Sequence, residues 1–245
     1  MSDISTFLDK LNALKKTDTI DIWIPSQDRS CKFTHITVNQ QKELLKSSVE
    51  GAAGLVNFAK ILNEIIIDNC LDKNVEINSI DKHPILIALR AASMGNLITI
   101  EDKEYNLFAL PLKSPLPPKK LKNTVSHKGV DISIKTPTLK NEISLYDQCV
   151  IDIKKLKDSN INDSIPILYT FEIIKFIESI TFEHDTIDFQ SLSHIDKKRI
   201  IENLPIGLTQ KVINFISTIR KIEEKFITFP DKVVVTINTL FFSAD

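Results

Sequence analysis

A proline-rich segment in the middle of the chain limits the fold more than any other feature of the sequence. Residues 110–123 read LPLKSPLPPKKLKN, with four prolines between positions 111 and 118. Proline lacks the backbone N–H that helices and central strands need, so this segment fits neither element. We predict a linker or arm over residues 111–128, which separates an N-terminal unit, 1–110, from a C-terminal unit, 129–245.

The N-terminal unit is expected to combine a β-hairpin with several helices. The spacing of apolar residues predicts a short amphipathic helix over residues 3–16, with Phe7, Leu8, Leu11 and Leu14 on one side. Alternating apolar and polar residues on both sides of the turn sequence PSQD predict a hairpin over residues 20–34.

Helix ends are visible further along the chain. Thr37 and Gln40 have the spacing of a capping box that starts a helix, and Ser193 is a similar start signal. Pro84 and Gly95 bracket another helix, because proline favours the first turn and glycine the position past the end.

The C-terminal unit is predicted to be mainly helical. A strand is expected at 130–135, a helix at 138–156, and one buried helix over the apolar stretch 165–182. A further amphipathic helix over 208–226 precedes a β-rich tail at 232–242. The sequence shows no internal repeat. The predicted class is α+β: a hairpin and helices, a proline-rich linker with a short β segment, and a helical half ending in a β-rich tail.

Composition argues against several classes of ligand. The chain has only five glycines, and the pair in GAAG matches no nucleotide-binding spacing. The net charge of -1 predicts no attraction to nucleic acid or to an anionic membrane. The three cysteines include no Cys-x-x-Cys pair, so we expect no zinc site and no cofactor. We expect them to be small core residues.

We also expect no targeting segment. The first residues lack the apolar core of a secretory signal, and no stretch approaches the ~20 apolar residues of a membrane span. The chain is therefore expected to be made in a reducing cytoplasm.

The sequence FEHDTIDF is the densest group of titratable residues. Its carboxylates and imidazole are suitable metal ligands, which would allow a metal-dependent hydrolase. Neighbouring residues do not converge on one point without a tight loop, so a polar connection is the simpler interpretation. The residues concerned are Glu183, His184, Asp185 and Asp188.

No other catalytic residue is predicted, so we expect a protein that is not an enzyme and works through contacts. The hairpin around Trp23 and the proline-rich arm are the candidate partner-binding segments. An aromatic pair near residue 242 either closes the core or anchors a neighbour. The candidate residues are Trp23, Lys113, Pro115, Pro117, Pro118, Lys119, Lys120, Phe241 and Phe242.

The order of several segments resembles the baseplate hub and hub-assembly proteins of T4-like contractile-tailed bacteriophages. IPSQDRSCKFTHITVNQQKELL resembles the family's opening strand and helix start, and IIIDNCLD resembles an apolar helix ending in Asn-Cys. PILIALRAASMGNLI is similar to a helix with a central arginine and a following glycine, here Arg90 and Gly95. VDISIKTPTL resembles a strand of the family that is followed by Pro-x-Leu. IIENLPIGLTQKVINFIST resembles its two C-terminal helices, and VVVTINTLFF resembles its terminal aromatic pair.

This resemblance implies a structural or assembly role in the central hub of the tail baseplate. It implies other baseplate or tail proteins as partners and assembly in the host cytoplasm. We expect the chain in the virion tail baseplate, where symmetry allows a homo-oligomer. Two alternatives stay open: a tail assembly chaperone that leaves the particle, and the metal-dependent hydrolase. The zinc implied by Cys-x-x-Cys pairs in some relatives is not expected here, because this chain has none.

Overall fold

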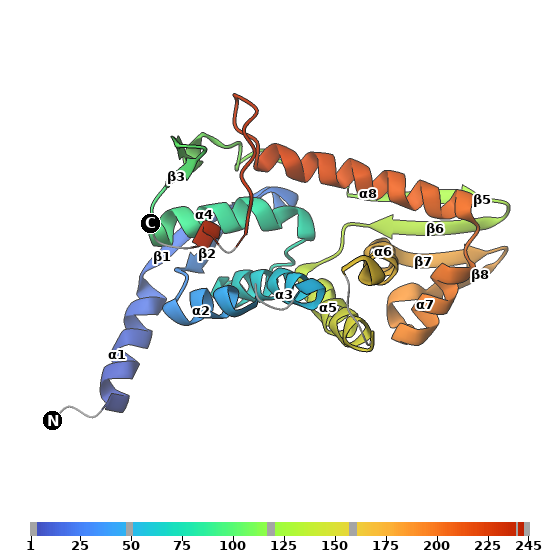
Figure 1. Ribbon diagram of the computed structural model, residues 1–245, viewed down its shortest axis with the longest axis horizontal. Coiled ribbons are helices and arrows are strands. Elements are labelled where there is room, and N and C mark those ends of the chain that lie inside the picture. The colour runs from blue at the N-terminus through green and yellow to red at the C-terminus, as the bar shows by residue number, and fades with distance from the viewer. Residues whose placement is uncertain (1–3, 48–50, 117–120, 157–160, 239, 243–245) are drawn as a thin grey trace.

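The computed structural model describes residues 4–47, 51–116, 121–156, 161–238 and 240–242, and it has the mixed α+β class that the sequence predicts (Figure 1). The first half contains α1 (Ile4–Thr17), β1 (Thr19–Ile24), η1 (Pro25–Gln27), β2 (Arg29–Thr34), α2 (Val38–Ser47), α3 (Gly51–Asn69), η2 (Ser79–Asp81), α4 (Lys82–Met94), β3 (Leu97–Ile100), β4 (Lys103–Asn106) and η3 (Leu107–Ala109). The second half contains β5 (Lys122–His127), β6 (Val130–Lys135), α5 (Leu139–Lys154), α6 (Ile161–Phe176), β7 (Ile177–Phe182), β8 (Asp185–Asp188), η5 (Phe189–Ser191), α7 (His194–Asn203), α8 (Ile206–Phe226) and η6 (Leu240–Phe242).

Two clusters of buried apolar side chains form the interior. The first cluster lies among the β1–β2 hairpin, α3 and α4, where Phe33, Ile66 and Leu86 have no exposed surface. The second cluster lies between helices α5 to α8 and the antiparallel sheet β5-β6-β7-β8, where Ile132 and Ile174 are equally enclosed. Burial of these side chains is the main favourable contribution to the stability of each half.

Helix α3 belongs to both clusters. Near its start, Ala52 and Val56 pack in the second cluster, while Leu62 and Ile66 pack in the first. The helix also lies alongside α5, as Figure 1 shows at the lower centre of the molecule. One rigid helix therefore joins the two interiors.

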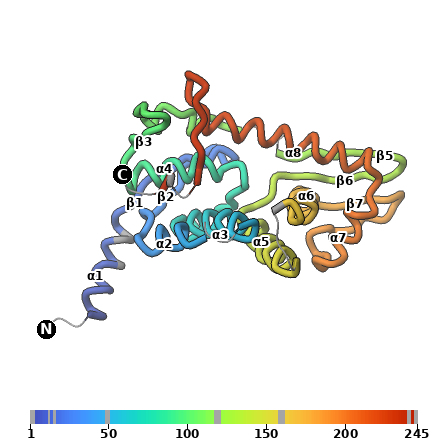
Figure 2. The backbone as a smooth tube through the Cα atoms, viewed as in Figure 1, coloured from blue at the N-terminus to red at the C-terminus, as the bar shows by residue number. Residues whose placement is uncertain are grey.

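The C-terminal tail returns to the first cluster. Figure 2 follows the chain from the end of α8 back to α4. Phe229, Phe241 and Phe242 are buried there, and the last two rings pack edge to face with centroids 5.0 Å apart. Arg90 donates from Nε to the carbonyl oxygen of Phe241 at 3.2 Å, and Gln41 donates to that of Phe242 at 2.6 Å. The tail thus closes the first cluster.

Helix ends and the first hairpin lie where the sequence predicts. β1 and β2 pair in register from Thr19 opposite Thr34, and the Thr37–Gln40 capping box is formed by N–H contacts of 3.0 and 3.3 Å. Helix α4 ends at Gly95, whose φ of 99° a side chain would strain. These elements depend on local signals, which is why a single sequence indicates them.

The structure differs from the sequence-based expectation at three places. Residues 165–182 are not one helix: α6 ends at Phe176, and 177–182 form β7, whose backbone pairs with β6. Residues 122–127, inside the predicted linker, form strand β5. In the described tail, β structure is limited to the bridge between Thr228 and Val234, because the tail is held by side-chain burial and not by a neighbouring strand.

A repeated order of elements is present although the sequence shows no repeat. The series hairpin, helices, hairpin and 3-10 helix occurs first from β1 to η3 and again from β5 to η5. The second hairpin of each series leads into its 3-10 helix in the same way, through the side chains of Asn106 and Asp188, each of which accepts a backbone N–H two residues on. Only in the second series do the two hairpins join into one sheet.

Candidate functional site

The described part of the proline-rich arm lies against the turn of the first hairpin. The backbone N–H of Leu116 donates to the carbonyl oxygen of Pro25 at 3.1 Å. Lys113 and Pro115 are exposed, so they are accessible to a partner. The other predicted arm residues lie outside the described residues: Pro117, Pro118, Lys119 and Lys120.

Trp23 lies on β1, two residues before Pro25, and is half-buried. Its indole Nε1 is enclosed without a hydrogen-bond partner among the described residues. An indole N–H usually finds a partner when it is buried, so this one is an unused donor. The structure therefore brings two predicted contact segments, the hairpin and the arm, to one end of the first hairpin.

Phe241 and Phe242 do not join this surface. Their exposed fractions are 7% and 0%, and the guanidinium of Arg90 lies 5.8 Å from the centroid of the Phe241 ring. The sequence left open whether these rings close the core or anchor a neighbour, and in the structure they close the core. Their contact with a partner stays a prediction.

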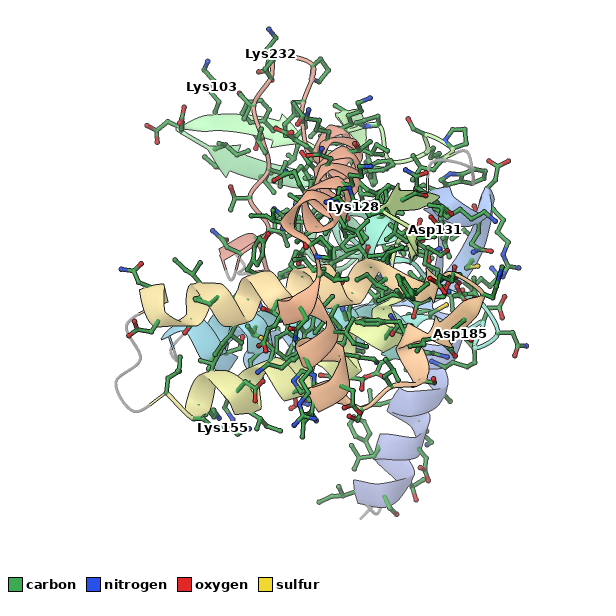
Figure 3. The ribbon with its side chains drawn as sticks, turned by 90° about the vertical axis from the view of Figure 1, so that its right-hand side faces the viewer. Lys103, Lys128, Asp131, Lys155, Asp185 and Lys232 are labelled. Carbon is green, nitrogen blue, oxygen red and sulfur yellow. The ribbon has the colours of Figure 1, made fainter. Side chains whose placement is uncertain are left out.

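The titratable residues of FEHDTIDF are spread along the β7–β8 hairpin: Glu183 and His184 form its turn, and Asp185 and Asp188 are the first and last residues of β8. Glu183, His184, Asp185 and Asp188 are exposed, and Asp185 is labelled in Figure 3. Within the described ranges, no three His, Cys, Asp or Glu side chains are close enough together to hold a metal ion. Asp188 lies at the other end of β8, where it accepts the backbone N–H of Gln190 at 3.1 Å.

The arginine and glycine that carry part of the resemblance are in direct contact. Arg90 is 5% exposed, and its Nη1 donates to the carbonyl oxygens of Gly95 and of Leu97, the second at 3.0 Å. With the bond to Phe241, the guanidinium joins the end of α4, the start of β3 and the tail. A buried arginine needs such acceptors, since its charge is otherwise costly to remove from water.

The strongest electrostatic feature is a buried ion-pair cluster where helices of both halves meet. Glu142 of α5 is 2% exposed and accepts from Lys175 of α6 at 3.1 Å and from Asn63 of α3 at 2.9 Å. Lys175 also pairs with Glu172 at 2.7 Å, and Lys82 of α4 lies 3.8 Å from Glu142.

Opposing effects set the protonation of this cluster. Burial alone would lower the pKa of Lys175, but the negative charge of Glu142 holds it well above its usual value. Burial would raise the pKa of Glu142, but Lys175 and Lys82 hold it below its usual value. Both groups are therefore charged near neutral pH and stabilise each other.

Glu223 of α8 faces the same cluster without a salt bridge among the described contacts. It is half-buried, and burial raises its pKa from 4.5 to about 7, since the nearby Lys82 and Lys175 are offset by Glu142 and Glu172. This carboxyl is the member of the cluster that titrates near neutral pH.

The sequence alone does not predict the ion-pair cluster. Glu142 and Lys175 are 33 positions apart, and only the helix packing brings them together. One signal was visible: Lys175 interrupts the apolar run FEIIKFI, where a buried lysine needs an anionic partner.

Burial limits the reactivity of the three cysteines. The cysteines Cys31, Cys70 and Cys149 are buried thiols, as predicted, and burial raises the pKa of Cys149 to about 12. A thiol held protonated in this way is a poor nucleophile.

None of the described helices has both the length and the apolar content of a bilayer span.

Comparison with known proteins identifies the family. The profile of the family described as T4 bacteriophage base plate protein matches residues 17–228, which include the second cluster, most of the first cluster and most of the elements. The chain belongs to this family and has a structural or assembly role in the phage tail baseplate, where it interacts with other tail or baseplate proteins. No curated protein and no solved structure matches the chain.

Replacing Lys175 by methionine should destabilise the fold strongly. The substitution removes the nearest cation from Glu142, whose side chain is 3% exposed, and leaves it Lys82 at 3.8 Å, which costs about 3–5 kcal/mol. Glu172 is less affected, because it keeps its contact with Arg220 at 3.0 Å. Urea denaturation measures the loss. The matched control is Lys155→Met, which breaks a salt bridge whose lysine side chain is 71% exposed and should cost about 1 kcal/mol or less. Equal losses in the two variants would contradict the role of burial.

Replacing Glu223 by glutamine should stabilise the chain at alkaline pH. The folded chain takes up a proton on Glu223 between pH 4.5 and about 7, so wild-type stability falls as pH rises through that window. Glutamine mimics the protonated form, so the variant should gain about 1–3 kcal/mol over the wild type at pH 8 and little at pH 4. Denaturation at both pH values tests this, with the exposed neighbour Glu224→Gln as control. An equal gain in stability at both pH values would contradict the raised pKa of Glu223.

Proposed function

We propose that this chain is a component of the baseplate hub and acts there by protein–protein contact. The observation that carries the proposal is the ordered series of hub-like segments inside a chain of the baseplate family. The exposed arm beside Trp23 supports it, since an aromatic ring next to accessible polar groups is typical of a contact surface.

The contact surface that we propose consists of the hairpin end and the adjoining arm: Trp23, Lys113 and Pro115, with Pro117, Pro118, Lys119 and Lys120 continuing it in sequence. Lys113 makes the surface locally basic, which favours a partner with carboxylates opposite the arm. Assembly takes place in the host cytoplasm, and the symmetry of a baseplate allows several copies per particle.

Mass spectrometry of density-purified virions with copy-number determination tests the function. We expect the chain in virions in a fixed ratio to other baseplate proteins, because a hub component stays where it is built. Absence from virions together with abundance in infected lysate would replace the proposal with a tail assembly chaperone. Absence from both, together with metal bound at His184 and lost in His184→Ala, would favour the hydrolase.

Reversing the charge of the arm should weaken assembly without unfolding the chain. Because Lys113 is exposed, Lys113→Glu should change the melting temperature by about 2 °C or less. Its recovery with other tail proteins from infected cells should fall clearly. Lys103→Glu, at an exposed site on β4, is the matched control. If both variants assemble like the wild type, the arm is not the contact surface.

A further inference from the structure

A groove between α8 and the edge strand β5 gathers positive charge. Helix α8 lies along β5, and β8 forms the opposite edge of the same sheet (Figure 1). The groove has a volume of about 690 Å³, and its described lining contains no acidic residue but four lysines: Lys122, Lys211, Lys221 and Lys225. The whole chain has a net charge of -1, so this groove is a local concentration of one sign of charge.

Helical spacing brings the lysines of α8 to one side of the helix. Lys221 and Lys225 are about one turn apart, and Lys211 lies about four turns before Lys225. Glu224 stands between Lys221 and Lys225 in sequence, but it does not belong to the described lining. Lys122 joins the three lysines from β5, so both walls of the groove are basic.

The charges of the four lysines are not neutralised within the described part of the chain, where the ion pairs involve other residues. Lys211 donates from Nζ to the carbonyl oxygen of Ser126 at 2.6 Å, a contact that leaves its charge in place. The pKa of Glu178 is lowered mainly by Lys135, which contacts its carboxylate at 2.6 Å, and less by Lys122. The groove is therefore able to bind carboxylates from outside the chain.

The opposite edge of the sheet is acidic. In the described sheet β8 has a neighbour on one side only, and all four of its residues are exposed. Glu183 in the turn and Asp185 and Asp188 in the strand supply carboxylates, and the side chain of Ile187 is 45% exposed. Natural proteins protect such an open edge with charges or cover it. The carboxylates oppose pairing with a second β8 and leave this edge open to a basic surface.

Basic neighbours reduce the negative charge of this edge only in part. Asp188 lies near Lys197, and Lys128 lies in the adjoining β5–β6 turn, at the same end of the sheet as Asp185 (Figure 3). Among the described contacts, neither Glu183 nor Asp185 forms an ion pair. These two carboxylates are thus available to a partner.

The other acidic hairpin fits the groove less well. The β3–β4 hairpin exposes Glu101, Asp102 and Glu104. Lys103 lies between the last two in sequence, so a groove lined by lysines would meet a like charge there. Strand β8 contains neither lysine nor arginine.

Charge allows one arrangement of two copies through these surfaces. Two grooves that face each other would bring lysines together, and two β8 edges would bring carboxylates together. A groove that faces a β8 edge pairs opposite charges. Because the two surfaces lie at opposite edges of one sheet, each copy has both to offer. Such a head-to-tail contact repeats from copy to copy and gives a closed ring or a filament.

Nucleic acid fits the groove less well than carboxylates do. Proteins that bind single strands stack the bases on accessible aromatic rings. The aromatic ring in the described lining is that of Phe215, which is 8% exposed. The net charge of -1 also provides no general attraction to phosphates.

We propose that the lysine groove between α8 and β5 of one copy binds the acidic β8 edge of a second copy. The lysines face Glu183 and Asp185, and the contact covers Ile187. That the copies meet in a baseplate rests on the proposed function. The contact itself does not, so the two proposals can fail separately.

Sedimentation equilibrium of the full chain tests the contact. At low salt the average mass should rise with concentration and pass that of a dimer, because each added copy brings a further free surface. In 1 M salt, where screening acts over about 3 Å, the association should be at least about tenfold weaker.

Charge reversal identifies the two surfaces. Lys221→Glu in the groove and Asp185→Lys on β8 should each weaken association at least about tenfold. An equimolar mixture of the two variants should associate again, because the groove of the Asp185→Lys chain and the β8 edge of the Lys221→Glu chain are unchanged. A substitution that only damaged the fold would not be rescued by mixing.

Two controls carry the same charge changes elsewhere. Lys42→Glu on α2 and Glu104→Lys on β4 change exposed residues outside both surfaces. Both should associate like the wild type, and the circular dichroism of all four variants should match that of the wild type.

Several results would overturn the proposal. One is a chain that stays monomeric at every concentration at low salt. Another is association that survives both reversals, or that is lost in Glu104→Lys instead of Asp185→Lys. A third is a monomeric chain that binds a single-stranded oligonucleotide and loses this binding in Lys221→Glu, which would make nucleic acid the occupant. A chain that is absent from virions but associates as expected would disprove the hub role and leave the contact intact.

Discussion

The contact between Glu142 and Lys175 is the interaction on which the relative placement of the helices depends. A buried charge is tolerated only when opposite charge and hydrogen bonds replace the water that it has lost. Here the replacements come from α3, α4, α5 and α6, so these four helices must be in place together before the two charges are satisfied. Apolar packing would accept small shifts of these helices, whereas the 3.1 Å contact between the two charged groups does not.

The same junction holds the two halves of the chain together. Helix α3 connects the two interiors, and the cluster fixes its crossing with α5. The arm and Trp23 lie at the turn end of the first hairpin, while α1 leaves the other end of that hairpin, where Thr19 pairs with Thr34. The arm and α1 therefore lie at opposite ends of one two-stranded hairpin.

Sequence reasoning succeeded where structure is set by a few neighbouring residues. The hairpin around Pro25, the Thr37 capping box and the α4 boundary at Gly95 all follow from local backbone chemistry. The family assignment is also confirmed, at the level of the baseplate.

The errors arose where distant parts of the chain decide the outcome. Residues 177–182 look like a continuation of an apolar helix, and they become a strand because β6 offers them a partner. The ion-pair cluster was missed because its members meet only after four helices pack. No sequence pattern distinguishes the buried Phe242 from the exposed Phe7, since both are apolar aromatic residues and only the fold covers one of them.

The return of the tail to the first cluster has a consequence for the order of folding during translation. The β1–β2 hairpin, α3 and α4 leave the ribosome early, but the surface that receives Phe241 and Phe242 stays open until residue 242 has also emerged. Until then Arg90 lacks the carbonyl oxygen of Phe241, and apolar side chains of α4 are exposed to water. During this interval the nascent first half exposes apolar surface, which favours aggregation, and slow translation of the last third of the message would prolong the exposure.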